Sequence, residues 1–281
     1  MQFEFPGTIG VPDGRYLARE TAGERVLVIE TDGAPSPPRR RRRAKQAESG
    51  ATPAQLPLTR VTAVRAQEPF DSAADAQSWL EQTFAEEDSI DAAIDDALRL
   101  LNRALHAQAV ASADPFGVEL GAGHAVVVRI GHGSGKEVAA GRFTEAKAID
   151  PRSATGSKRH RREDDLRPQE RLAAVLGGRE NLDACESLIL RARADLDVGR
   201  RREAALQLRI GLEAMLVELA GALADPDHEN DMVELEGRRS EAGSAANAAL
   251  RGDLPVDEER RVTELVEICE RVLRRRRVLR G

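Results

Sequence analysis

The chain has few aromatic residues, few lysines and two cysteines, and each shortage limits the kinds of core and of binding surface that we expect. Aromatic side chains make up 3% of the 281 residues, so we expect a core of leucine, alanine and valine. Lysine occurs only at positions 45, 136, 147 and 158, so arginine supplies 38 of the 42 basic residues. Cys185 and Cys269 lie at apolar positions of helical patterns, where a free thiol acts as a small hydrophobe. In a reducing compartment we expect them to stay unpaired.

Long apolar runs are also absent. No stretch of 18 apolar residues exists, and Met1 is not followed by a basic segment and then an apolar one. We therefore expect neither a membrane helix nor a secretory signal, and a cytoplasmic location. The net charge of −6 argues against a surface built throughout for nucleic acid, so any such binding must be local.

Catalytic and metal-binding patterns are missing as well. The histidines at positions 106, 124, 132, 160 and 228 are scattered, without the spacing of metal ligands. No spacing of Ser, Cys or carboxylate residues singles out a catalytic triad or an acid pair, although such sites assemble in space. We expect no cofactor and no metal, and an enzyme is not the favoured class.

The glycine-rich turn at 131–136 superficially matches a phosphate-binding loop. A strand followed by Gly-His-Gly-Ser-Gly-Lys could expose backbone amides and a lysine to phosphate. However, Ile130 occupies the position of the first glycine and Glu137 that of the magnesium-binding Ser or Thr. The turn is therefore interpreted as a flexible hairpin.

An acidic stretch at 225–236 superficially matches a calcium loop, with oxygen ligands at loop positions 1, 3 and 5 and a glutamate at position 12. Asn230 replaces the glycine of the sharp turn, and Pro226 stiffens the second position. We therefore interpret the stretch as an acidic connection between helices.

Two amphipathic helical patterns meet at Gly199. Apolar residues recur every three or four positions at Leu182, Cys185, Ile189, Ala192 and Leu196, and again at Ala205, Leu208, Leu212, Met215 and Leu219. Gly199 can take the left-handed conformation just past a helix end, so the helices are predicted to form an antiparallel hairpin. A hairpin leaves half of each apolar face uncovered, so further helices must complete a bundle.

Those further helices are visible on both sides of the hairpin. Pro168 suits the first position of a short helix that carries Leu172 and Leu176 and ends at Gly177. A weaker, alanine-rich helix is indicated by Met232, Leu235, Ala242, Ala246 and Leu250. The last helix is predicted from Asp257 to about Leu279, with Val262, Leu265, Cys269 and Val272 on its apolar face.

The hairpin resembles two known groups of helical proteins. Ala192, Gly199, Ala204, Leu208 and Gly211 have the spacing of small and apolar residues in one tetratricopeptide-like hairpin. That match covers about thirty residues once, whereas such arrays need about three copies. The helices also resemble the bundles of the HEPN group of RNA-cleaving and toxin-associated proteins, but no histidine follows Asp231 to complete the Arg-to-His motif of that group. We assign no family from these residues.

The first half of the chain is predicted to be an antiparallel sheet with two helices on one face. Strand-like runs lie at 15–20, 25–31, 58–66, 125–130 and 136–140, and the continuously apolar run 26–29 is expected to be central in the sheet. Asp71 is predicted to cap a helix anchored by Trp79, Leu80 and Phe84. A second helix is predicted from Ser89 to Ser112, with Ile90, Ile94, Leu98, Leu101 and Leu105 on one face.

Two polar segments divide the chain. Residues 33–55 are predicted to be a disordered linker or insertion, because they offer almost no apolar surface to offset the entropy of ordering. Residues 148–165 form a second, basic linker. The fold class is therefore α+β, with an α+β domain at 1–147 and a helical bundle domain at 166–281.

Two arginine runs are the candidate binding residues. They comprise Arg39, Arg40, Arg41, Arg42 and Arg43, and Arg274, Arg275, Arg276 and Arg277. Both could contact phosphates or an acidic partner, or could be solvated. We expect a non-enzymatic cytoplasmic interaction or regulatory protein whose helical domain binds another protein. The alternative is a nucleic-acid-associated protein that binds phosphates weakly and without sequence preference through these arginines.

The domain division predicts two protease-resistant units. Residues 33–55 and 150–165 lack the apolar content to stay packed, so they should be cut first. Limited proteolysis with mass mapping tests this expectation. Resistance of both segments at protease levels that digest an unfolded control would contradict the division.

Overall fold

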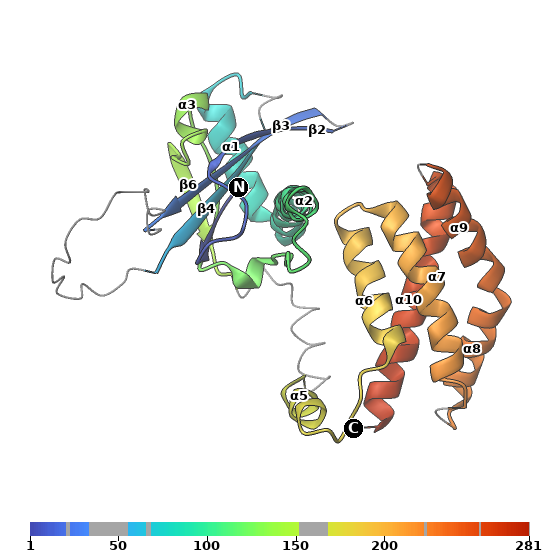
Figure 1. Cartoon of the computed structure of the whole chain (residues 1–281). Coiled ribbons are helices and arrows are strands. Elements are labelled where there is room, and N and C mark those ends of the chain that lie inside the picture. The colour runs from blue at the N-terminus through green and yellow to red at the C-terminus, as the bar shows by residue number, and fades with distance from the viewer. Residues whose placement is uncertain are drawn as a thin grey trace, which may run out of the picture. The chain divides into compact units, whose positions relative to one another are not determined.

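The computed structural model describes residues 1–20, 23–33, 56–65, 69–151, 168–221, 224–252 and 254–280, without the side chains of Glu20 and Arg280. The chain divides into two compact units, Met1–Ser157 and Lys158–Gly281, each of which is visible in Figure 1. This border lies inside the predicted linker at 148–165. Residues 34–55, with Arg39 to Arg43, and residues 152–167 lie outside the described part of the chain.

The described part of the N-terminal unit contains a six-stranded sheet in which all neighbouring strands are antiparallel. The strands are β1 (Gln2–Pro6), β2 (Gly14–Glu20), β3 (Gly23–Asp32), β4 (Leu58–Arg65), β5 (Val127–His132) and β6 (Glu145–Ile149), in the order β2-β3-β4-β1-β5-β6. The predicted fold class, an antiparallel sheet followed by a helical bundle, is therefore confirmed.

Strand β1 lies in the middle of this sheet, between β4 and β5, and was not predicted. Its side chains alternate: Phe3 and Phe5 are buried in the core, whereas Gln2 and Glu4 lie on the opposite face. The apolar run 26–29 belongs to β3, which is flanked on both sides but lies one strand from the edge. The expectation that this run is central was only approximately right.

The predicted strand at 136–140 is wrong. Residues 136–138 belong to the single helical turn α3 (Gly135–Val138), which is closed by a hydrogen bond from the Val138 amide to the Ser134 carbonyl at 2.9 Å. The chain reverses at Gly141, whose φ of +71° favours glycine. Only then does β6 return antiparallel to β5, with Gly131 opposite Ala146.

Two helices pack on one face of the sheet (Figure 1). Helix α1 (Ala73–Ala85) is capped by Ser72, whose hydroxyl accepts from the Asp75 amide at 3.1 Å, so the predicted cap at Asp71 was one residue early. Helix α2 (Glu87–Ser112) buries Ile94, Leu101 and Leu105, among others, against the sheet. A short 3₁₀ turn, η1 (Ala122–His124), then leads into β5.

Asp96 connects α2 to strands β3 and β4 of the sheet. Its carboxylate lies 2.8 Å from a nitrogen of Arg25 and 2.9 Å from one of Arg65. Burial alone would raise the pKa of Asp96, but the hydrogen bonds from both arginines outweigh it and lower that pKa. The carboxylate is therefore charged at neutral pH and stabilises the attachment of the helix.

The C-terminal unit is a helical bundle. Its helices are α5 (Pro168–Leu176), α6 (Ala184–Asp197), α7 (Arg201–Glu218), α8 (Pro226–Gly237), α9 (Arg239–Arg251) and α10 (Val256–Arg280). Helices α6, α7, the consecutive pair α8–α9 and α10 run alternately up and down in Figure 1. Helix α10 contacts α6, α7, α8 and α9, and α7 contacts α6, α8, α9 and α10, so these two helices form the centre of the unit.

The predicted hairpin of α6 and α7 is confirmed, and two glycines explain its geometry. Gly199 has a φ of +79°, and the amides of Gly199 and Arg200 bond back to the carbonyls of Leu196 and Asp195, which ends α6. Gly211 lets the helices approach closely, because a methyl group there would lie 2.9 Å from Cδ1 of Ile189. The predicted apolar residues of α7, from Ala205 to Leu219, are fully buried.

Three predictions in this unit need correction. Leu182 precedes α6 and is 62% exposed, because its helical face begins only at Cys185. The single helix predicted from Met232 to Leu250 is two helices, since the chain breaks at Arg238, and Leu250 is 66% exposed. Helix α5 begins at Pro168 as predicted, but Leu172 and Leu176 are exposed.

The buried stripe of α7 predicts a strong effect of Leu208→Asp. The leucine is fully buried at the centre of the bundle core, so an unpaired carboxylate there should lower the free energy of unfolding by about 3–5 kcal/mol. Ile210→Asp is the matched control, because Ile210 lies on the same helix and is 58% exposed. It should cost no more than about 0.5 kcal/mol.

Thermal melting of the full chain, followed by circular dichroism at the helical band, compares the two variants. Equal melting temperatures for Leu208→Asp and the unchanged protein would show that this face of α7 is exposed to solvent.

Candidate partner-binding pocket at the end of the helical bundle

The last turns of α10 lie beside the first turns of α6 on one side and of α8 on the other. In Figure 1 the start of α8 and the end of α10 lie at the same end of the bundle. This arrangement brings a run of arginines next to acidic residues at two helix N-termini. Carboxylates are favoured near helix N-termini and arginines near helix C-termini, so the local charges suit the helix dipoles.

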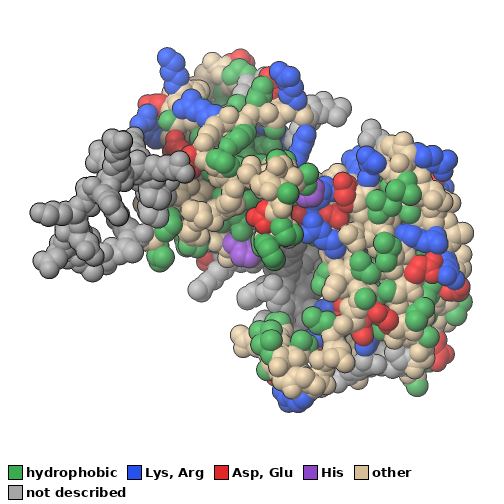
Figure 2. Space-filling view, in the orientation of Figure 1, with side chains coloured by type: hydrophobic (Ala, Val, Ile, Leu, Met, Phe, Trp, Pro, Cys, Tyr) green, Lys and Arg blue, Asp and Glu red, His purple; other side chains and the backbone are tan. Residues whose placement is uncertain are grey.

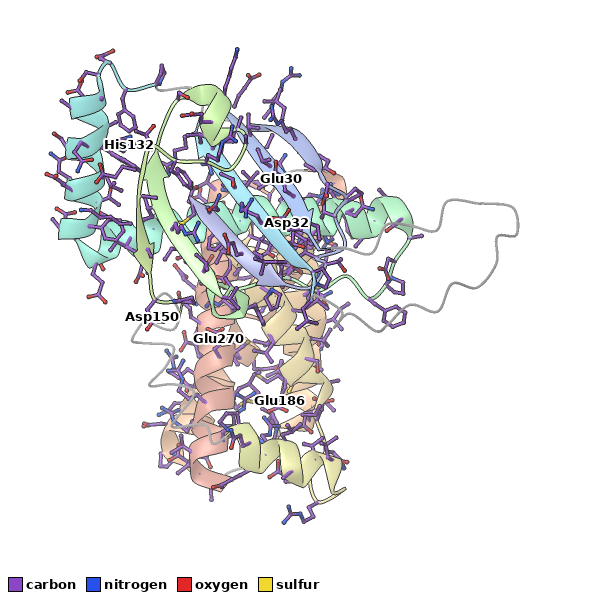
Figure 3. The ribbon with its side chains drawn as sticks, turned by 90° about the vertical axis from the view of Figure 1, so that its left-hand side faces the viewer. Glu30, Asp32, His132, Asp150, Glu186 and Glu270 are labelled. Carbon is purple, nitrogen blue, oxygen red and sulfur yellow. The ribbon has the colours of Figure 1, made fainter. Side chains whose placement is uncertain are left out.

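On the α6 side, two arginines of the predicted run are held by carboxylates. Arg276 pairs with Asp183, the residue before α6, and Arg277 lies 3.5 Å from Glu186. Glu186 is 3% exposed and also binds Arg171 of α5 at 2.5 Å. Figure 3 labels Glu186 and, further along the bundle, Glu270, which binds Arg193 of α6 at 2.9 Å. These partly buried pairs connect α5, α6 and α10 to one another.

On the α8 side, Asp231 is the central carboxylate. It is 8% exposed and lies 2.9 Å from Arg271 and 2.6 Å from Arg275. Asp225 caps α8 by accepting a hydrogen bond from the His228 amide at 2.8 Å, and lies 3.7 Å from Arg275. His228 is itself 1% exposed, and neither of its ring nitrogens has a hydrogen-bond partner among the described residues.

Arg274 is different from its neighbours. It is exposed and forms no ion pair with any residue that the structure describes. It lines a solvent-open pocket of about 310 Å³. The other lining residues are Asp225, Arg271, Arg275, Val278 and Leu279. Val278 and Leu279 are 61% and 52% exposed, so two aliphatic side chains lie beside the unpaired guanidinium.

The structure thus separates the arginines that the sequence grouped together. Arg275, Arg276 and Arg277 bind carboxylates of the bundle, and Arg274 reaches the pocket. Whether any of them binds a ligand stays a prediction. Sequence reasoning missed Arg271 and Asp231. A signal existed for Arg271, which lies three and four residues before Arg274 and Arg275, on the same face of a helix.

The phosphate-loop and calcium-loop patterns gain no support from the geometry. Gly131 and His132 belong to β5, and α3 after them has four residues, too few for the helix that follows a phosphate loop. Residues 226–237 are helix α8, so interpreting them as a connection was wrong, and a helix does not wrap around calcium. Within the part of the chain that the structure describes, no group of His, Cys, Asp and Glu side chains could hold a metal ion.

The two thiols are poor nucleophiles. Cys185 and Cys269 are both fully buried, as predicted. Burial raises the pKa of each to about 12, helped by Glu218 at Cys185 and by Glu270 at Cys269. Both thiols are therefore protonated at neutral pH and serve as core residues.

The sheet face opposite the helices carries a second cluster of charges. Arg60 lies 3.5 Å from Glu4, 3.6 Å from Glu30 and 3.4 Å from Asp32. Glu30 and Asp32 are labelled in Figure 3, which shows this face of the sheet. One guanidinium that bridges three carboxylates accounts for the cluster as an ion-pair network within the sheet.

The visible surface of the helical unit carries both apolar and charged side chains. Figure 2 shows its apolar side chains in small groups separated by charged ones. Single exposed aliphatic residues are normal on proteins. What distinguishes the α10 pocket is the combination of a hollow, an unpaired arginine and two exposed aliphatic side chains. Among the described helices, none is long and apolar enough to cross a lipid bilayer.

Comparison with known proteins adds no assignment: the chain matches no protein-family model, no curated protein and no solved structure.

The Asp231 network predicts a measurable loss of stability for Asp231→Asn. The substitution removes a nearly buried charge that binds two arginines, and should lower the free energy of unfolding by about 1–3 kcal/mol. The loss is limited because the freed guanidiniums regain part of their hydration. Asp257→Asn is the control, since the Asp257–Arg260 pair is exposed and such pairs contribute about 0–1 kcal/mol. Chemical denaturation of the full chain measures both. Equal midpoints for the two variants would contradict a structural role for Asp231.

Proposed function

We propose that this protein is a non-enzymatic, cytoplasmic interaction protein whose helical unit binds a segment of another protein at the α8–α10 pocket. The supporting observation is the pocket itself, where Arg274 is unpaired and Val278 and Leu279 are exposed around a hollow of about 310 Å³. Protein interfaces favour arginine and apolar side chains at their centres, with a polar rim.

The side chains around the pocket are already held in place by ion pairs, which suits binding without a large rearrangement. The neighbouring side chains Arg271 and Arg275 are fixed by Asp231, and Arg276 and Arg277 tie the same helix end to α6. Side chains that are already held lose little conformational entropy when a partner docks, which favours affinity.

The alternative function, nucleic-acid binding through arginines, is less well supported by this geometry. Three arginines of the run 274–277 already bind carboxylates of the bundle. Each would have to leave a carboxylate to bind a phosphate, so the charge that drives such binding is largely neutralised. Arg39 to Arg43 lie outside the described residues and contribute no observation to either function.

The proposal predicts that a protein partner is lost when the pocket changes. Val278→Asp places a carboxylate on the apolar side of the pocket and should weaken binding at least about tenfold, since an apolar contact is replaced by a charge. Leu250→Asp is the matched control, because Leu250 is 66% exposed at the far end of the bundle, in the last turn of α9.

The measurement is a pull-down with the full chain and both variants, with and without nuclease. We expect proteins whose retention survives nuclease and the Leu250 change but not the Val278 change. Retention that depends on intact nucleic acid, or that is indifferent to Val278→Asp, would contradict the proposal.

A further inference from the structure

The charges around the α8–α10 pocket are unevenly distributed. On the α10 side, Arg271 pairs with Asp231 and Glu234, and Arg275 pairs with Asp231, Asp225 and Asp227. This leaves the Arg274 guanidinium as the pocket cation without an ion pair among the described residues. A guanidinium offers five N–H donors in a planar fork that matches a carboxylate. The pocket therefore has one strong position for one anionic group.

The α8 side of the same pocket is acidic. Asp225 lines the hollow, and Asp227 beside it is 76% exposed, with its carboxylate 3.5 Å from Arg275. Asp231 and Glu234 lie within the same ion-pair network around Arg271. These carboxylates repel a ligand with several adjacent negative charges, such as a nucleic acid, but they tolerate a ligand with a single one.

The aliphatic part of the pocket lies close to the cation in the helix. Val278 follows Arg274 by one helical turn, so both project from the same face of α10, and Leu279 adds a second exposed aliphatic side chain. A ligand that binds Arg274 therefore places its neighbouring group against Val278 or Leu279. An apolar group there buries surface that is otherwise in water.

We infer that the pocket binds a short protein segment in which one aspartate or glutamate lies beside a large aliphatic residue, with the carboxylate on Arg274 and the aliphatic side chain on Val278 and Leu279. This inference rests on the proposed function, because it specifies the chemistry of the same partner. The exposed carboxylate of Asp227 adds a preference against further acidic residues on the α8 side.

Selection of peptides tests the inference without knowledge of the natural partner. A random peptide library is selected on the full chain, and binders lost on Val278→Asp are sequenced. The inference predicts that these binders are enriched in Asp or Glu adjacent to Leu, Ile or Val. A representative binder should lose at least about fivefold in affinity when its acidic residue becomes the neutral amide, as a charge-assisted hydrogen bond is lost.

Arg274→Gln supplies the decisive comparison. It should remove the difference between the acidic peptide and its amide form, whereas Arg260→Gln, at an exposed arginine near the start of α10, should preserve it. Asp227→Asn should leave binding intact or tighten it slightly, because a repulsive rim charge is removed. A short single-stranded oligonucleotide is measured alongside.

The possible failures are distinguishable. Pocket-dependent binders with neutral or basic composition would overturn the inference and leave the proposed function standing. An oligonucleotide that binds more tightly than every selected peptide, and that is released by Arg274→Gln, would overturn the inference in favour of nucleic acid. If no binder depends on Val278, both the inference and the proposed function fall.

Discussion

Four consecutive arginines at the end of α10 pose the main electrostatic problem of the helical unit. Helix α10 contacts every one of the helices α6 to α9, so repulsion at its end would disturb the whole bundle. Asp183 and Glu186 neutralise Arg276 and Arg277 from α6, while Asp231 neutralises Arg275 from α8. The packing of α6 and α8 against α10 thus depends on the same ion pairs that offset the repulsion among the four arginines.

This constraint also decides which side chain remains for binding. Successive residues on a helix point in directions about 100° apart, so four consecutive arginines cannot all face two neighbouring helices. Arg274 points to neither set of carboxylates and lines the pocket with Val278 and Leu279. The surface that we propose for an acidic partner segment therefore lies at a helix end whose other arginines form internal ion pairs.

Much of the fold could be predicted from the sequence because the apolar patterns of α6, α7 and α10 are long and regular. Leu208 and Leu265, for example, are fully buried where the spacing placed them. Strand β1 escaped notice because it has only five residues, and the alternation of Phe3 and Phe5 with Gln2 and Glu4 is too short a signal. The break at Arg238 has only a weak local signal: Gly237 precedes it, but Arg238 makes no capping hydrogen bond with its side chain at the start of α9.

The candidate site could be predicted only in part. The arginine run 274–277 is visible in the sequence, but its partners are distant along the chain. Asp183 lies 93 residues from Arg276, and Asp231 lies 44 residues from Arg275. Pairing across such separations follows from tertiary packing. No local pattern could therefore show that three of the arginines pair with carboxylates and that Arg274 does not.

The most direct measurement is the mobility of individual arginine side chains, from the nuclear relaxation of their ε-nitrogens in the full chain. Ion pairs with carboxylates of the bundle should hold Arg271, Arg275, Arg276 and Arg277 rigid on the picosecond-to-nanosecond timescale. Arg274 should be mobile alone and become rigid when a pocket-binding peptide is added. Uniform mobility across all five arginines, or an Arg274 that is rigid without ligand, would contradict this division of the run into structural and binding residues.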